Sequence, residues 1–162
     1  MTEGEFETYI LPCHRKMYGT AVVILGDRDE ASDTVQEAFA RLWERRDEIE
    51  NPRNPEGYCQ TVVKRMCIDR LRRRRQEVSI DEVVEPGAEN VLPRLEAGDS
   101  LRRVDALLDR LPAQQSRVIR MSALSGMDNA EKADATGLTQ VNVRALLSRG
   151  RKMLKKMFEK DI

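Results

Sequence analysis

The chain has 162 residues and a formal net charge of zero, with 35% charged and 4% aromatic residues. This length allows one ordinary domain or two small ones, and the composition is typical of a soluble, helix-rich protein with small cores. No stretch approaches the roughly 18 apolar residues of a membrane span. Because the acidic N-terminus also lacks an apolar signal core, we expect a cytoplasmic protein without membrane insertion.

The zero net charge results from cancellation between four segments. Residues 1–50 hold 6 Lys/Arg against 12 Asp/Glu, and residues 77–100 hold 1 against 7. Residues 51–76 hold 8 Lys/Arg against 2 Asp/Glu, and residues 101–162 hold 13 against 7. Charge that is sorted in this way indicates more than one polar partner.

Helical spacing predicts two helices before residue 47. Apolar residues of the first recur every three or four positions: Phe6, Tyr9, Ile10, Cys13, Met17, Ala21 and Ile24. We expect Pro12 to kink it and Gly26 to end it. The second, capped by Asp27 or Asp29, has this predicted buried stripe: Ala31, Val35, Ala38, Phe39, Leu42 and Trp43. Its opposite face, which alone indicates only a solvated surface, carries Asp33, Gln36, Glu37, Ala40, Arg41 and Glu44.

A loop rich in turn residues at 51–57 precedes a third helix, residues 58–75. Its apolar stripe comprises Cys59, Val62, Val63, Met66 and Cys67. Its far side carries Thr61, Arg65 and Arg72, flanked by Lys64, and the helix ends in the arginine run 72–75. Because Lys and Arg neutralise phosphates and release counterions, this basic face favours nucleic-acid binding over a merely solvated face.

Residues 77–100 are acidic, contain Pro and Gly and show little periodicity, so we expect a flexible linker between domains 1–76 and 101–162. In the second domain, apolar spacing predicts a helix over 101–111, which Pro112 stops, and another that ends near Gly126.

The final segment has the spacing of a helix-turn-helix. Asp128 and Glu131 form a predicted capping pair, Gly137 closes the first helix, and Thr139 caps the second. The predicted inward residues of that second helix are Val143, Leu146, Leu147, Leu154 and Phe158. Its predicted outward residues are Val141, Arg144, Ala145, Ser148, Arg149 and Lys152. Such a helix lies in the DNA major groove, where Arg can pair with guanine, and Gln140 and Asn142 with adenine.

Cys13, Cys59 and Cys67 show no C-x-x-C spacing, and we expect buried free thiols. Cys13 beside His14 provides only half of a metal ligand set, so we expect no metal and no cofactor.

Four segments in this order resemble the extracytoplasmic-function (ECF) sigma factors of bacterial RNA polymerase over nearly the whole chain. They are ILGDRDEASDTVQEAFARLW (24–43), YCQTVVKRMCIDRLRRRR (58–75), LDRLPAQQSRVI (108–119) and GLTQVNVRALLSRGRKML (137–154). The resemblance implies an all-α fold of two small helical domains, the first with three helices. It also implies a non-enzymatic function, which is to bind core polymerase, direct it to promoters and assist their melting.

The resemblance assigns roles to residues of both domains. The first domain would bind the clamp helices of the polymerase's largest subunit through Asp33, Gln36, Glu37 and Arg41. Together with the loop 48–57, it would bind the minus-ten promoter element through Asn54, Tyr58, Lys64, Arg65, Arg72 and Arg73. The second would bind the minus-thirty-five element through Gln140, Asn142, Arg144, Ala145, Ser148, Arg149 and Lys152. The resemblance further implies contacts with the polymerase flap region and with an anti-sigma factor.

Four positions depart from the family pattern, one of which is Ala123, where a Glu is frequent. Tyr58 stands where many members have Trp, and Arg65 where many have Asn, so the identity of the flipped promoter base is left open. Lys132 stands where an aliphatic residue is usual. We expect its long stem to carry the ammonium to solvent, or its helix to be shifted.

Three other classes of protein compete with this hypothesis. A helix-turn-helix repressor or activator would bind duplex DNA without polymerase, but it leaves the arginine-rich helix unassigned. An enzyme is disfavoured because His14 and three scattered cysteines make no nucleophile–base arrangement. A helical adaptor would use its charges for protein contacts alone.

Overall fold

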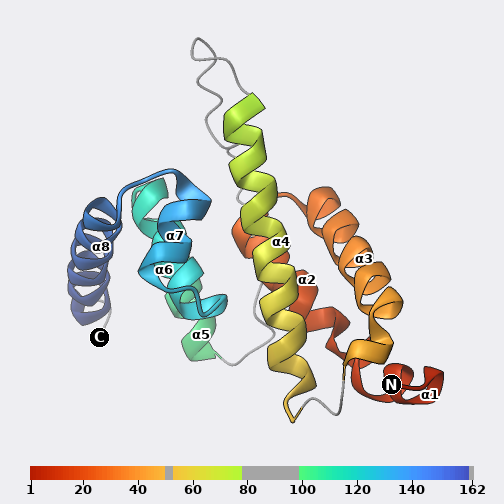
Figure 1. Cartoon of the computed structure of the whole chain (residues 1–162). Helices are drawn as coiled ribbons and strands as arrows, with labels where there is room; N and C mark the ends of the chain where they lie inside the picture. The colour runs from red at the N-terminus through yellow and green to blue at the C-terminus, as the bar shows by residue number, and fades with distance from the viewer. Residues whose placement is uncertain (50–52, 78–98, 161–162) are drawn as a thin grey trace. The chain divides into compact units, whose positions relative to one another are not determined.

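The computed structural model describes residues 1–49, 53–77 and 99–160, which form helices and connecting turns without a strand among them (Figure 1). This confirms the predicted all-α fold class. The chain divides into two compact units, Met1–Val91 and Leu92–Ile162. Most of the predicted linker, residues 78–98, lies outside the described residues.

The elements of the first unit are α1 (Glu3–Tyr9), η1 (Leu11–Cys13), α2 (His14–Leu25), α3 (Arg28–Glu44), η2 (Arg46–Glu48) and α4 (Pro55–Glu77). The sequence predicts one kinked helix where the structure has α1, η1 and α2. Pro12 lies in the short 3-10 turn η1, because proline lacks the N–H that a continuous α-helix needs there. Gly26 ends α2 in the left-handed conformation, with φ of 70°.

Packing of α2 against both α3 and α4 forms the core of the first unit. Every residue from Thr20 to Leu25 is buried, which is typical of a central helix. Tyr9, one of the apolar residues whose spacing predicts the first helix, is exposed. Trp43, at the end of α3, is only half-buried, and its ring packs edge-on against Phe6 with 5.1 Å between centroids.

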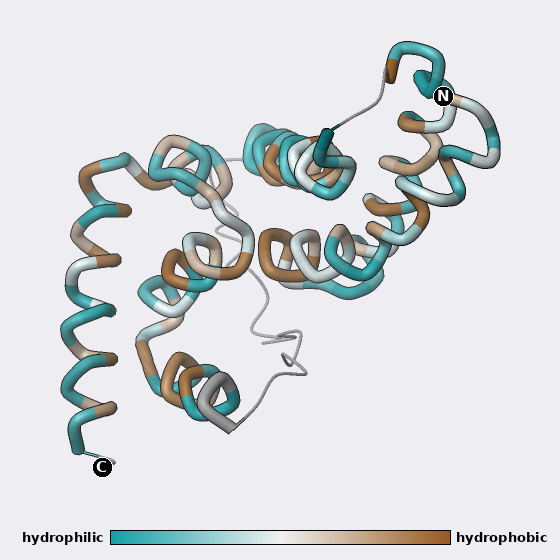
Figure 2. Tube along the Cα trace, turned by 90° about the horizontal axis from the view of Figure 1, so that it is seen from below, coloured by the Kyte–Doolittle hydropathy of each residue, from teal (hydrophilic) through white to brown (hydrophobic). Residues whose placement is uncertain are grey.

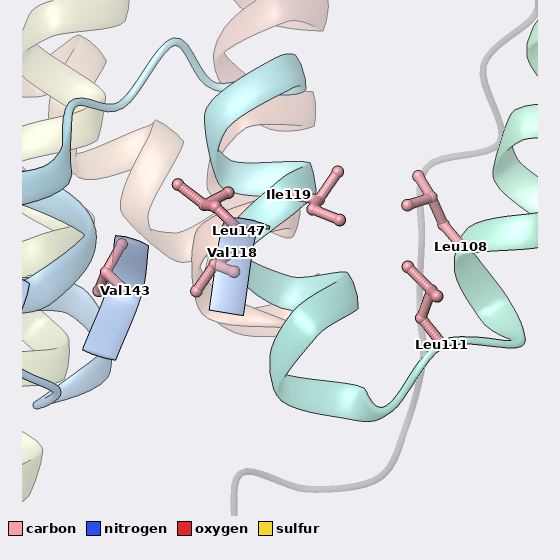
Figure 3. Close-up of a cluster of buried hydrophobic side chains, with 6 residues drawn as sticks. All are labelled: Leu108, Leu111, Val118, Ile119, Val143 and Leu147. Carbon is pink, nitrogen blue, oxygen red and sulfur yellow. The ribbon is translucent and has the colours of Figure 1, made fainter. Parts of the chain in front are cut away.

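The elements of the second unit are α5 (Asp99–Asp109), α6 (Ala113–Leu124), α7 (Asn129–Thr136) and α8 (Gln140–Lys160). Its core, drawn in Figure 3, consists of side chains from α5 and the turn after it, from α6 and from α8: Leu108, Leu111, Val118, Ile119, Val143 and Leu147. Figure 2 shows apolar positions recurring along α8 between polar ones. The prediction for Phe158 is wrong, since this side chain is exposed and Met157 packs against the core.

Two features that the apolar spacing does not predict fix α5 and α8 to α6. A Cβ atom at Gly150 would lie 2.6 Å from the Cδ1 atom of Ile119, so the glycine lets α8 approach α6 without displacing this side chain. Arg120 is buried and forms ion pairs with Asp105 and, at 2.8 Å, with Asp109. Because a buried guanidinium needs such partners, these carboxylates join α5 to α6.

Candidate nucleic-acid and protein-binding surfaces

The outward face of α3 begins directly after a well-formed helix cap. The Asp27 side chain accepts hydrogen bonds from the backbone N–H groups of Asp29 and Glu30, at 2.8 and 3.0 Å. Asp33 and Gln36 are exposed on this helix, as predicted. They place a carboxylate and an amide within reach of a partner.

Glu37 corrects the expectation that the predicted partner-binding acids are freely exposed. Its Oε1 atom accepts a hydrogen bond from Arg41 at 2.8 Å, and its Oε2 atom accepts one from Arg70 of α4 at 3.2 Å. The hydrogen bond from Arg70 lowers the pKa of the Glu37 carboxyl, and Arg41 lowers it further, against an opposing effect of burial. Glu37 is therefore an ionised carboxylate held between two guanidinium groups.

The start of α4 differs from the predicted loop 51–57. The helix begins at Pro55, and the Asn54 side chain caps it by accepting a hydrogen bond from the Gly57 N–H at 3.0 Å. Asn54, which is predicted to contact DNA, thus has a structural role as a helix cap. The same hydrogen bond holds its side chain against the start of α4. Tyr58 is 42% exposed on the first turn, which leaves its ring accessible for stacking. Residues 50–52 of the predicted DNA-binding loop lie outside the described residues.

The cations of α4 divide between two faces, which the prediction of one basic tail did not anticipate. Arg70 and Arg74 point toward α3, where Arg70 pairs with Glu37 and Arg74 with Glu30. The sequence spacing indicates that these two arginines face the core side of α4. Arg70 and Arg74 lie at helical spacing from the buried Val63, on the same face of the helix.

The other face of α4 carries the residues predicted to contact nucleic acid. Arg65, Arg72 and Arg73 are exposed, and Lys64 is half-buried. Arg72 also forms an ion pair with Asp69 at 3.7 Å, an exposed contact of low energy that a phosphate could replace. This face can therefore present several cations to a polyanion.

The turn between α7 and α8 has the geometry predicted for a helix-turn-helix. Asp128 and Glu131 form a reciprocal capping box, and Gly137 ends α7 in the left-handed conformation with φ of 77°. The Thr139 hydroxyl accepts a hydrogen bond from the Asn142 N–H at 3.1 Å, which caps α8.

The outward face of α8 is almost wholly exposed. Its exposed polar residues include those predicted to contact DNA: Gln140, Asn142, Arg144, Ser148, Arg149 and Lys152. Ala145 is half-buried, while Val141 is the most exposed large apolar residue of the described chain, at 64%. Donors, acceptors and apolar atoms on one exposed helix face are the chemistry needed to contact base edges in a major groove.

Lys132, which stands where the family usually has an aliphatic residue, is buried in the second unit. The residue lies within α7 and is only 2% exposed. Burial lowers the pKa of its ammonium group and Arg151 lowers it further, whereas Asp128 raises it. The sequence identified the unusual residue but not its burial.

The cysteines are buried free thiols, as predicted. Burial raises the pKa of the Cys67 thiol to about 12, and burial together with the neighbouring Cys13 raises that of Cys59 to about 12. The His14 ring stacks on Phe39, with 5.7 Å between centroids. Across the described residues, no three His, Cys, Asp or Glu side chains are placed to hold a metal ion. The described helices also include none with the length and apolar character to cross a membrane.

Comparison with known proteins identifies the family of both units. Residues 4–77 match Sigma-70 region 2, and residues 101–154 match Sigma-70, region 4. The chain therefore belongs to the sigma-70 family, as a sigma factor of the ECF subfamily.

Two individual proteins illustrate the similarity. An "ECF RNA polymerase sigma factor SigE" of Mycolicibacterium smegmatis is 27% identical over 147 residues, which are 86% of this chain and 56% of the relative. The chain thus spans about half the length of this curated relative. The fold is similar to that of the sigma factor RpoE of Bartonella quintana, solved in complex with the anti-sigma factor NepR. That match has a TM-score of 0.52 and 21% identity, and covers 98% of this chain and 99% of the other.

Proposed function

We propose that this chain binds core RNA polymerase and directs it to promoters that carry a minus-ten and a minus-thirty-five element. The observation that carries the proposal is the pairing of two different binding units on one sigma-70 family chain. One presents the exposed polar face of α3 beside the basic helix α4, and the other presents the recognition helix α8. Binding alone would provide the function, with no covalent chemistry performed by the chain.

In this proposal, the first unit has two partners. Asp33, Gln36, Glu37 and Arg41 of α3 contact the polymerase clamp helices, since charged groups of both signs give specificity to a protein interface. The start and outer face of α4 contact the minus-ten element through Asn54, Tyr58, Lys64, Arg65, Arg72 and Arg73. An exposed aromatic ring next to cations suits a single strand whose bases leave the stack.

The second unit reads duplex DNA in this proposal. Insertion of α8 into the major groove at the minus-thirty-five element brings these residues toward base edges and phosphates: Gln140, Asn142, Arg144, Ala145, Ser148, Arg149 and Lys152. We place the protein in the cytoplasm, with contacts to the polymerase flap region and control by an anti-sigma factor.

Run-off transcription on fragmented genomic DNA tests this function. The reaction contains bacterial core polymerase with or without the protein, and the 5′ ends of the transcripts are sequenced. We expect discrete new starts that share two upstream motifs. Absence of new starts, combined with duplex-DNA binding by the protein alone, would instead support a helix-turn-helix repressor or activator.

A further inference from the structure

The contact between α3 and α4 contains two ion pairs of similar form. The helices run antiparallel, so that Glu30 near the start of α3 pairs with Arg74 late in α4, while Glu37 pairs with Arg70 one turn earlier in α4. The two pairs differ in their contacts, because Arg74 contacts both carboxylate oxygens of Glu30, whereas Arg70 contacts one oxygen of Glu37. Glu37 has a second guanidinium partner, Arg41, on its own helix.

Arg41 and Arg70 hold the Glu37 carboxylate in place but leave part of its hydrogen-bonding capacity unused. One oxygen accepts from Arg41 and the other from Arg70, and each oxygen has a second lone pair available. The Glu37 side chain is 43% exposed, so a partner can reach these lone pairs. Because two donors already restrict its rotamers, a partner would not have to order this side chain on binding.

Arg70 is the less accessible of the two donors. Its side chain is 31% exposed, against 54% for Arg41, and it points to α3 instead of the outer basic face of α4. That outer face contains Arg65, on the side of the helix opposite Arg70. Arg70 is thus poorly placed to contact DNA bound on the outer face, and well placed to orient Glu37.

We propose that Arg70 is a positioning residue for polymerase binding: it holds the Glu37 carboxylate as a preorganised acceptor for a cationic group of the polymerase. This inference rests on the function proposed above. It assigns one arginine of the DNA-directed helix to the protein interface and leaves the cations of the outer face to nucleic acid.

The experiment measures the affinity of core polymerase for full-length variants. Arg70→Met should weaken binding by about threefold to tenfold, the effect of leaving one interface side chain to be ordered on association. Arg74→Met is the matched control, because it also removes one α3–α4 ion pair but does not touch Glu37. It should bind polymerase like the wild type, and Arg70→Lys should recover part of the loss.

A double-mutant cycle separates positioning from a general effect on the fold. If Arg70 acts through Glu37, the double variant Glu37→Gln with Arg70→Met should bind within about twofold of Glu37→Gln alone. Equal losses from Arg70→Met and Arg74→Met would overturn the proposal in favour of a structural role. Wild-type affinity for Arg70→Met would overturn it as well.

DNA binding by the free protein provides a second measurement. Arg70→Met should leave the affinity for promoter DNA and its salt dependence unchanged, because the residue faces α3. A reduced salt slope would identify Arg70 as a phosphate contact and overturn the assignment. If the wild-type chain itself fails to bind polymerase, the proposed function fails, which is distinguishable from failure of this inference.

Discussion

Lys132 is the residue whose environment departs furthest from its chemistry. An ammonium group loses hydration when it is buried, and the Lys132 residue as a whole is only 2% exposed. The nearby charges act in opposite directions, because Asp128 favours the protonated form and Arg151 disfavours it. The charged form of Lys132 is therefore expected to destabilise the second unit.

Replacement of Lys132 by Met should stabilise the second unit by about 1–2 kcal/mol at neutral pH, because an apolar side chain of similar length avoids the desolvation cost. Burial lowers the pKa of Lys132 in the folded chain below 10.5, so the unfolded chain binds more protons between the two values. Wild-type stability should consequently rise with pH through that window, and the advantage of Lys132→Met should shrink.

Amide hydrogen exchange of α6 and α8 in the full-length chain measures this difference. Lys155→Met serves as the control, since Lys155 is exposed and should change stability by less than about 0.5 kcal/mol. Lower protection in Lys132→Met than in the wild type would contradict the prediction.

Cys59 and Cys67 should be unreactive in the folded protein. Because burial raises the pKa of both thiols to about 12, almost no thiolate is present at pH 8. Titration with a disulfide reagent should give slow reaction in the folded chain and three rapid equivalents after denaturation, from the three free cysteines. Rapid reaction of either thiol in the folded state would show that it is accessible.

At the scale of single elements, α4 and α8 use charge differently. In α4, Arg70 and Arg74 form ion pairs with α3, and the remaining cations lie on other parts of the helix surface. In α8, Arg144 and Arg149 are exposed on the face that the helix-turn-helix geometry directs outward. The number of cations on a helix is therefore a poor measure of its capacity to bind DNA.

Arg149→Ala should reduce recognition of the minus-thirty-five element by about 1–3 kcal/mol if the guanidinium contacts a base. Lys155→Ala is the comparison, because Lys155 is an exposed cation of α8 outside the predicted base-contacting residues, and loss of such a charge should affect all DNA sequences nearly equally. Run-off transcription from promoters with and without the element measures the selectivity. Equal activity of Arg149→Ala and wild type on both promoters would exclude the base contact.

At the scale of the whole molecule, the covalent connection of two binding units matters for function. In the proposed function, when one unit binds its promoter element, the other is held near its own element at an effective concentration of up to about millimolar. Neither unit then needs a high affinity of its own.

Separation of the two units should therefore abolish specific initiation at nanomolar protein. A protease site introduced between residues 78 and 98 allows cleavage after purification, and the uncleaved chain is the matched control. Run-off transcription should fall by about 10²-fold or more on cleavage. Equal transcription by cleaved and uncleaved protein would show that the tether contributes nothing.

The sequence by itself determined the helical character of the chain and several of the helix ends. Helix caps such as Asp27, the Asp128–Glu131 capping box and Gly137 depend on residues within about four positions, so local chemistry specifies them. Periodicity also identified most of the core and the outward face of α8.

Only the tertiary structure decided which charged groups meet. Glu37 and Arg70 are 33 positions apart, and Glu30 and Arg74 are 44 apart. Periodicity predicts the face on which a residue lies, but not which helix packs against that face or which charge it brings. For the same reason, the burial of Lys132 became evident only once α7 was packed within its unit.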